Sequence, residues 1–416
     1  MRAARLALAV TLLLVVASGC DWLQAGYDSG RSGTNPVEPA LTVSSVGNLA
    51  PKFSISTLGR NYGQPIVIGQ SLYATSFEAS TNTARIEQFD ATTGVRGWST
   101  SLSTAAGSVT DPEWASGTVY AVTAPSSSSG SATLFALASS TGVTRWSVPL
   151  PSGFSVVESV TLDRGRVFVV LLQHDPFFPF GGSVAVVALD GGTGSTIWSF
   201  TYSADQQAHV GAVVSWSGRY VVLAYNCCGG TNRPTGIVGF PRTTFLDEAD
   251  GSVHTESGSA SDRSLRLCAD DLCYGTVEDI VNGTWPSPAT AVDPNTGNVV
   301  WTGIDAVAAA VSQRSAVLAN PTGLTAVDPR TGSAQWTSPT LANVSHIAPP
   351  VIAGDVVYFV TSDYKATLHT YDASNGSSIG SVDIPTPATI STLHAPVVAN
   401  GMVYVNQTAA ISAYAP

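Results

Sequence analysis

Asp90-Ala-Thr-Thr-Gly94, with Trp98 four residues further on, is the stretch that decides the fold. A short apolar run ends at Asp90, whose carboxylate can accept hydrogen bonds from turn amides, and Gly94 can take the positive φ that such a turn needs. Trp98 then supplies a large apolar plate that can pack between neighbouring sheets. The pattern recurs at 138–146, 190–198, 293–301 and 328–336, with weaker copies at 247–255 and 372–380.

A second pattern alternates with the first. It begins with Pro and ends eight residues later in Tyr, with a Gly near the middle, and therefore reads as two short strands around a tight turn. Four copies share this spacing, and four looser copies fill the gaps: Pro65–Tyr73, Pro112–Tyr120, Pro350–Tyr358 and Pro396–Tyr404, then 160–168, 213–221, 266–274 and 311–318. Each unit thus predicts four strands in about 35–57 residues, the period of a propeller blade.

The two ends of the chain complete one further unit. The segment Ile411–Ala415 matches a strand leading to an eighth Asp position but lacks the strand that should follow. Residues 47–55 resemble that missing strand, with Phe53 in the Trp position. We therefore predict an all-β fold, an eight-bladed β-propeller of four-stranded blades closed by the N-terminal strand, over residues 46–416. Seven blades remain the alternative because the middle repeats are weak.

The amino terminus has the features of an export signal. Arg2 and Arg5 precede the apolar run Leu6–Val16, which is too short to span a membrane comfortably. The run leads to Ala17-Ser-Gly-Cys20, which resembles the bacterial lipobox. We predict a signal peptide over 1–19, a lipid on Cys20 and a tether over 20–45, which places the protein on the outer face of a cell membrane. An ordinary signal peptide followed by a stray Cys is the alternative.

The net charge and the cysteines indicate which partners and which disulfides to expect. The formal net charge is −11 and the chain has no basic patch, so we predict that it has no nucleic-acid partner. Export permits disulfides. Cys268 and Cys273 flank a short turn, and opposed strand positions can be bridged, so we predict a disulfide between them. A crosslink from this hairpin to Cys227 or Cys228 is the competing arrangement, and that adjacent pair is itself a candidate disulfide.

Motifs of catalysis do not occur in the sequence. It has no HExxH pair, no GxSxG elbow and no Cys/His spacing typical of zinc. We therefore predict no catalytic, metal or cofactor residue, and a protein that is not an enzyme. Two long loops of neighbouring blades, with a histidine beside them, are the candidate partner-binding surface, which comprises Phe177, Phe178, Phe180, Arg233, His209 and the Cys227-Cys228 step. The alternative is a purely structural role, in which the phenylalanines fold back over a blade.

The repeat resembles that of pyrroloquinoline-quinone-type propellers, and residues 21–36 are similar to the opening of many such proteins. One branch of that family holds quinoprotein dehydrogenases, which bind the quinone and Ca²⁺ over the channel and carry a disulfide between adjacent cysteines. The other holds non-catalytic lipoproteins, including the propeller lipoprotein of the outer-membrane barrel-assembly machinery. The dehydrogenases' Ca²⁺ ligands, paired catalytic Asp and CxxCH haem site have no visible counterpart here.

The function predicted from these features is that of a lipid-anchored, monomeric binding or scaffold protein that uses the loops of one propeller face. Its partner would be another exported protein or a component of the cell envelope. Two alternatives remain: an oxidoreductase that depends on the quinone and Ca²⁺, and an extracellular sensor or carbohydrate-binding module.

Overall fold

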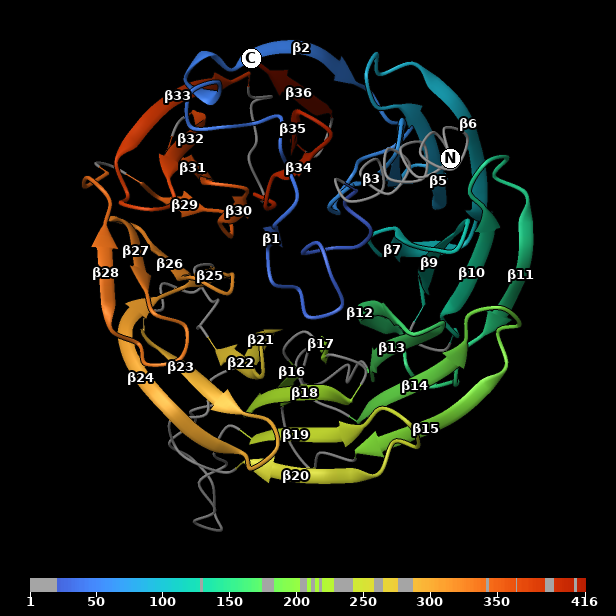
Figure 1. Cartoon of the computed structure of the whole chain (residues 1–416). Coiled ribbons are helices and arrows are strands. Elements are labelled where there is room, and N and C mark those ends of the chain that lie inside the picture. Colours follow the sequence, from blue (N-terminus) through green and yellow to red (C-terminus); the bar gives the residue numbers. More distant parts are fainter. Residues whose placement is uncertain are drawn as a thin grey trace, which may run out of the picture.

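The computed structural model of the 416-residue chain describes residues 21–127, 130–173, 183–202, 208–210, 214–216, 219–227, 242–257, 265–275, 287–341, 344–363, 365–385, 393–407 and 410–416. Eight small antiparallel sheets stand around a central axis as the blades of a propeller (Figure 1). Within the described residues, no helix is long and apolar enough to cross a membrane.

Blades I to IV follow one another from the N-terminal side, each ordered from the innermost strand outward. Blade I holds β3 (Ile66–Ile68), β4 (Ser71–Glu78), β5 (Thr83–Asp90) and β6 (Arg96–Ser103). Blade II holds β7 (Ala106–Val109) and β8 (Glu113–Ala115), which share the inner position, then β9 (Thr118–Pro125), β10 (Thr133–Ala138) and β11 (Thr144–Pro149). Blade III holds β12 (Val156–Asp163), β13 (Arg166–Leu172), β14 (Val184–Asp190) and β15 (Thr196–Tyr202). Blade IV holds β16 (Ala208–Val210) and β17 (Val214–Trp216), then β18 (Tyr220–Cys227), β19 (Arg242–Asp247) and β20 (Val253–Ser257).

Blades V to VIII complete the ring. Blade V holds β21 (Leu265–Ala269), β22 (Leu272–Gly275), β23 (Ser287–Asp293) and β24 (Asn298–Ala306). Blade VI holds β25 (Ala308–Val311), β26 (Ala316–Asn320), β27 (Gly323–Val327) and β28 (Ala334–Thr337). Blade VII holds β29 (His346–Ile347) and β30 (Val351–Ala353), then β31 (Val356–Ser362), β32 (Ala366–Asp372) and β33 (Ser378–Ile384). Blade VIII holds β34 (Val397–Ala399), β35 (Met402–Asn406), β36 (Ile411–Ala415) and, from the other end of the chain, β2 (Ala50–Ile55), which follows the short 3₁₀ helix η1 (Val46–Asn48).

The closure predicted from the sequence is confirmed. Strand β2 pairs antiparallel with β36, and Phe53 lies opposite Ala413. The predicted eight-bladed fold is likewise confirmed. The N-terminal strand thus supplies the outermost strand of blade VIII and joins the first and last parts of the chain in one sheet.

The turn that recurs in the sequence forms as its residue types predict. The Asp90 carboxylate accepts hydrogen bonds from the amides of Thr92 (2.9 Å) and Thr93 (2.8 Å). These bonds, together with those from the two threonine hydroxyls, lower the pKa of Asp90. Gly94 has φ +73° and donates its amide to the Asp90 carbonyl oxygen.

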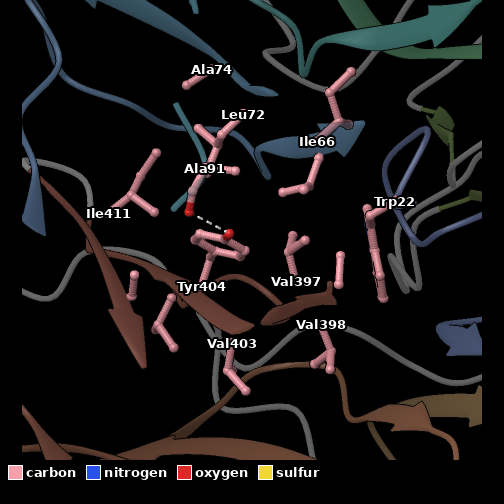
Figure 2. Packing of buried hydrophobic residues seen from close by; sticks show 14 of the residues in the cluster. Trp22, Ile66, Leu72, Ala74, Ala91, Val397, Val398, Val403, Tyr404 and Ile411 are labelled. Carbon is pink, nitrogen blue, oxygen red and sulfur yellow. Dashed lines mark hydrogen bonds between the residues drawn. The ribbon is translucent and has the colours of Figure 1, made fainter. Parts of the chain in front are cut away.

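The apolar core lies between adjacent blades. Figure 2 shows it where blade VIII meets blade I, with Leu72, Val403 and Tyr404 in the same cluster. The Tyr404 hydroxyl donates a 2.7 Å hydrogen bond to the carbonyl oxygen of Ala91, across the junction. The last blade is therefore fixed to the first by packing and by a directional bond.

The propeller has two distinct ends. In blades I to VII the turn between the first two strands and the turn between the last two lie at one end, which we call the turn face; blade VIII has the first of these turns. The amide of Ala91 donates to the Gln70 carbonyl, for example, and Gly191 donates to Gly165 in the same way. The opposite end, the loop face, carries the connections between second and third strands and those between blades.

Candidate functional site: the channel and its two mouths

The central channel contains part of the chain itself. Residues 21–38, which we call the belt, run inside the ring, and Figure 1 shows this blue segment with β1 (Thr34–Asn35) at the centre. The belt begins at blade I, where Asp21 Oδ1 accepts a 2.7 Å hydrogen bond from the Gly69 amide. Trp22 then exchanges two backbone hydrogen bonds with Val67 (2.7 and 3.0 Å) and is completely buried. The sequence predicts a tether over 20–45, whereas residues 21–38 are integrated into the packing of the ring.

The belt next binds blades II and III. The Trp114 amide donates to the Leu23 carbonyl (2.9 Å). The Gln24 amide group both accepts from the Leu162 N–H (3.0 Å) and donates to the Leu162 carbonyl (3.1 Å). Arg31 Nη2 donates to the carbonyl of Val160 (3.1 Å). On both of these blades the belt thus binds backbone groups of the innermost strand.

The second half of the belt binds blades V to VIII. Backbone hydrogen bonds join Cys268 to Gly30 (2.7 Å), Val311 to Ser32 (2.8 Å) and Ile352 to Gly33 (2.9 Å). Strand β1 pairs parallel with β30. The contacts with blade VIII come from side chains: Asn35 Nδ2 donates to Val398 O (2.9 Å), and Glu38 Oε2 accepts from Gly401 N (3.1 Å). Both ends of the belt thus meet at the turn face, where Asn400 Nδ2 donates to the Gly69 carbonyl (2.9 Å).

Local sequence explains how the belt curves through so narrow a space. Gly26 and Gly33 have φ +73° and +68°, which a residue without Cβ adopts at no steric cost. A Cβ on Gly30 would lie 2.1 Å from the Cys268 carbonyl oxygen, so only glycine permits that approach. Between the glycines, the Asp28 carboxylate accepts hydrogen bonds from the amide (2.9 Å) and hydroxyl (2.7 Å) of Ser32.

A buried polar cluster lies beside the belt, where it meets blades I, II and VIII. The side chain of Gln64 accepts a hydrogen bond from the Gly26 amide (2.7 Å) and donates one to the Ala395 carbonyl (3.0 Å). The backbone N–H of Gln64 donates to Asp111 Oδ1 (3.0 Å). Glu113 is close enough to Asp111 to interact with it electrostatically. The cluster therefore joins three blades and the belt through partly buried polar contacts.

Burial dominates the electrostatics of this cluster. It raises the pKa of Asp111, and that of Glu113 well above its usual value, while the guanidinium of Arg31 opposes both shifts. Burial lowers the pKa of His394, and the Asp111 carboxylate opposes that shift. Sequence reasoning missed Asp111, Glu113 and Arg31 as a group; the two carboxylates on either side of Pro112 were the available signal.

A cleft of about 920 Å³ opens at the turn face between the belt and blades V to VII. Its floor includes buried Ser32 and Thr34, and its walls are mostly turn residues. Arg314 and Asp355 stand exposed at the rim, 3.9 Å apart. The cleft lies at the end of the propeller opposite the ends of β13 and β18, from which the chain continues into the predicted recognition loops.

The structure tests the predicted site residues unevenly. Phe177, Phe178, Phe180, Arg233, Cys228 and the lipidation site Cys20 lie outside the described residues. Strand β16 contains His209, whose backbone pairs with Asn226 of β18, and Cys227 ends β18. The candidate partner-binding surface therefore stays a prediction.

The disulfide prediction is confirmed. Cys268 and Cys273 are bonded to each other, with a Cα–Cα distance of 4.0 Å, and they are directly paired across β21 and β22. Both are buried, and the Cys268 amide is the group that binds the belt at Gly30. The bridge thus lies directly behind a belt contact.

The family resemblance implies a quinone and Ca²⁺ bound over the channel. Ca²⁺ takes six to eight oxygen ligands, and within the described part of the chain no group of three or more His, Cys, Asp or Glu side chains is placed to hold a metal ion. The belt, moreover, hydrogen-bonds to the inner strands of seven blades within the described residues.

The fold and the repeated turn place the chain in the class of β-propellers built from pyrroloquinoline-quinone-like repeats. A family model described as "Outer membrane protein assembly factor BamB" matches residues 82–266 and 287–415, and the chain belongs to that family. No curated protein matches the sequence.

Solved structures share the fold at low sequence identity. Quinohemoprotein alcohol dehydrogenase ADHIIG from Pseudomonas putida HK5 is 12% identical, with a TM-score of 0.67 over 97% of this chain and 81% of that one. BamB from Moraxella catarrhalis is 15% identical, with a TM-score of 0.58 over 88% and 100%. Sqt1 from Saccharomyces cerevisiae is 9% identical, with a TM-score of 0.58 over 88% and 97%. Because proteins with such different names share this fold with the chain, the similarity establishes the fold alone.

Proposed function

We propose that this chain is a lipid-anchored binding or scaffold protein on the outer side of a membrane, which captures another exported protein or an envelope component through its loop face. Membership of a family described by an outer-membrane assembly factor supports an envelope role. The long loops of blades III and IV, with Phe177, Phe178 and Arg233, are the proposed recognition surface.

The belt is the observation that carries this proposal. Propeller enzymes of the quinone type bind their cofactor over the channel, and here the channel holds residues 21–38. A protein whose centre is occupied by its own chain retains its outer loops and faces for binding. Residues with an aromatic side chain at a loop tip are frequent anchors of protein interfaces.

Crosslinking in cells, followed by mass spectrometry of the purified chain, tests the proposal. The wild-type protein is expected to yield a reproducible partner, and the double variant Phe177→Ser/Phe178→Ser is expected to lose it while melting near the wild-type temperature. The matched control is Leu58→Ser/Tyr62→Ser, which removes two exposed apolar side chains, 49% and 44% exposed, from the connection between β2 of blade VIII and β3 of blade I. The control is expected to keep the partner.

Two results would contradict the proposal. If the phenylalanine variant melts clearly lower and its folded fraction still captures the partner, these residues cap a blade. If the full chain binds pyrroloquinoline quinone with Ca²⁺, as seen by a saturable change in absorbance, the oxidoreductase alternative replaces the scaffold.

A further inference from the structure

The point at which the chain enters the propeller is fixed at the turn face. Asp21 accepts its hydrogen bond from Gly69, in the turn between β3 and β4, and Trp22 is immobilised by two backbone bonds and complete burial. Consecutive Cα atoms are only about 3.8 Å apart. A lipid on Cys20 would therefore be attached directly beside this turn, with no free linker between the anchor and the folded body.

The same face presents exposed aliphatic side chains. Six of them directly follow the turns between third and fourth strands on five consecutive blades, and the larger exposures are those of Val95 and Val143, each 65%. The others are Ile197, Val253, Val299 and Val300, between 36% and 48% exposed. Val37 of the belt, 47% exposed, adds one near the axis. Aliphatic groups on a surface beside a lipid anchor are suited to the headgroup region of a bilayer, where such side chains can be buried.

The charges of the turn face indicate which lipids it fits. Hydrogen bonds from turn amides and hydroxyls lower the pKa of several turn aspartates, among them Asp190, Asp328 and Asp372, so these carboxylates are ionised at neutral pH. The arginines Arg145 and Arg330 are exposed beside turns of the same face. A zwitterionic headgroup, which carries one charge of each sign, matches this mixture. An anionic headgroup would meet a majority of carboxylates and be repelled.

We propose that the turn face lies against a zwitterionic lipid surface and that the loop face points away from the membrane. This orientation rests on the lipid anchor of the proposed function. It places the recognition loops of blades III and IV toward the space in which an exported partner would be met. Because the belt is bonded to the inner strands of most blades, the anchor holds the whole ring and not a loose end.

The experiment uses the full lipidated chain on phosphatidylcholine vesicles that carry a nitroxide quencher at the headgroup. A fluorophore is introduced through a single non-natural amino acid, since the chain's own cysteines complicate thiol labelling. The test positions are Val143 and Ile197 on the turn face, and the control position is Ser80, exposed in the β4–β5 connection of the loop face. Quenching is expected to be several-fold stronger at the test positions.

Three further outcomes test the lipid anchor, the orientation and the choice of lipid separately. Equal quenching on both faces, with the protein still bound to vesicles, would overturn the orientation and leave the anchor intact. Loss of vesicle binding would reject the anchor and the orientation with it. Replacing half of the phosphatidylcholine by phosphatidylglycerol at low salt is expected to weaken quenching at Val143, and a stronger signal there would overturn the choice of lipid.

A spacer variant supplies the internal control. A long Gly/Ser segment between Cys20 and Asp21 behaves as a flexible coil and is expected to reduce the difference between Val143 and Ser80 while the protein stays on the vesicles. If the difference persists unchanged, the absence of a free linker does not orient the propeller and that step of the proposal is wrong.

Discussion

Trp301 Nε1 donates a 2.9 Å hydrogen bond to the backbone carbonyl oxygen of Pro329, across the junction between blades V and VI. The Tyr274 hydroxyl donates to the same oxygen (3.1 Å). Gly332 lies on the face of the indole, so that a Cβ there would be 2.8 Å from Trp301 Cδ2. Other tryptophans of the repeat donate in the same way to the backbone carbonyl oxygens of Ser139, Glu248 and Ala373. The repeat in the sequence therefore corresponds to the same junction formed between successive pairs of blades.

Replacing Gly332 by Ala is expected to destabilise this junction. The residue has φ +71°, which costs an L-residue roughly 1–2 kcal/mol. The clash with the indole should add about 1–3 kcal/mol of overpacking. Gly165→Ala is the matched control, because Gly165 has φ +76° and nothing within 4 Å of its virtual Cβ. Urea unfolding followed by circular dichroism measures both; equal losses would show that the close approach adds no cost.

The contacts of the belt predict that substituting two glutamines, Gln24 and Gln70, will change the stability of the protein by different amounts. Gln24 is buried and bonds both backbone groups of Leu162, whereas Gln70 is exposed and its side chain makes no recorded bond among the described residues. Gln24→Leu is expected to cost about 1–3 kcal/mol, because it leaves buried polar groups unpaired. Gln70→Leu is expected to be close to neutral.

Hydrogen exchange of peptides covering 21–38 provides the second readout for this pair. Faster exchange in the Gln24 variant alone is the expected result. Wild-type exchange and stability in that variant would mean that the belt is held without this side chain.

Repetition explains how much of the fold could be predicted from the sequence. The Asp-x-x-Thr-Gly turn and its Trp occur often enough to define blades, and the unpaired strand at Ile411–Ala415 requires a partner such as the segment around Phe53. The belt carries no repeat. Its contacts are single hydrogen bonds between residues far apart in the chain, such as Gln24 with Leu162 and Asn35 with Val398, and nothing in their spacing specifies them.

The buried cluster escaped sequence analysis for a related physical reason. Asp111 and Glu113 look like ordinary surface carboxylates around a Pro in the sequence, and only the path of the belt encloses them beside Arg31. The Cys268–Cys273 bridge could be predicted because both residues lie in one hairpin, where register follows from the turn.

The bridge itself offers a third prediction. The double variant Cys268→Ala/Cys273→Ala is expected to lose about 2 kcal/mol of stability, since the loop closed by a separation of five residues is short. A non-reducing peptide map of the wild type should show the two cysteines joined. A peptide that links Cys268 to Cys227 or Cys228 would contradict the pairing.

Stability should also depend on pH through Glu248. Burial, with repulsion from Asp163 added, raises the pKa of Glu248 to about 7, against 4.5 for an ordinary glutamate. Between these values the folded state holds a proton that the unfolded chain releases. The contribution to stability is therefore complete below pH 4.5 and is lost as pH rises to 7; it amounts to at most about 3 kcal/mol.

Glu248→Gln is the variant that isolates this contribution. The fall in unfolding free energy from pH 5 to pH 8 is expected to be smaller in the variant than in the wild type, by about 2 kcal/mol. Glu78→Gln is expected to leave the wild-type fall unchanged, because hydrogen bonds from Thr81 and Arg85 lower the pKa of this half-buried carboxylate and keep it ionised over the whole range. If Glu248→Gln follows the wild type over the whole range, Glu248 ionises like an exposed side chain.

Cys20 gives the last prediction. The small residues Ala17-Ser-Gly before it, after the apolar run Leu6–Val16, predict that it carries a lipid. Cys20→Ser should release the protein from membranes or leave it unprocessed, because no other apolar segment of the sequence is long and uninterrupted enough to hold it there. The belt makes a control possible: Asp21→Ala removes only the hydrogen bond to Gly69 and should fractionate with membranes as the wild type does. A Cys20→Ser protein that has lost residues 1–19 and still fractionates with membranes would show that something other than a lipid attaches this propeller to them.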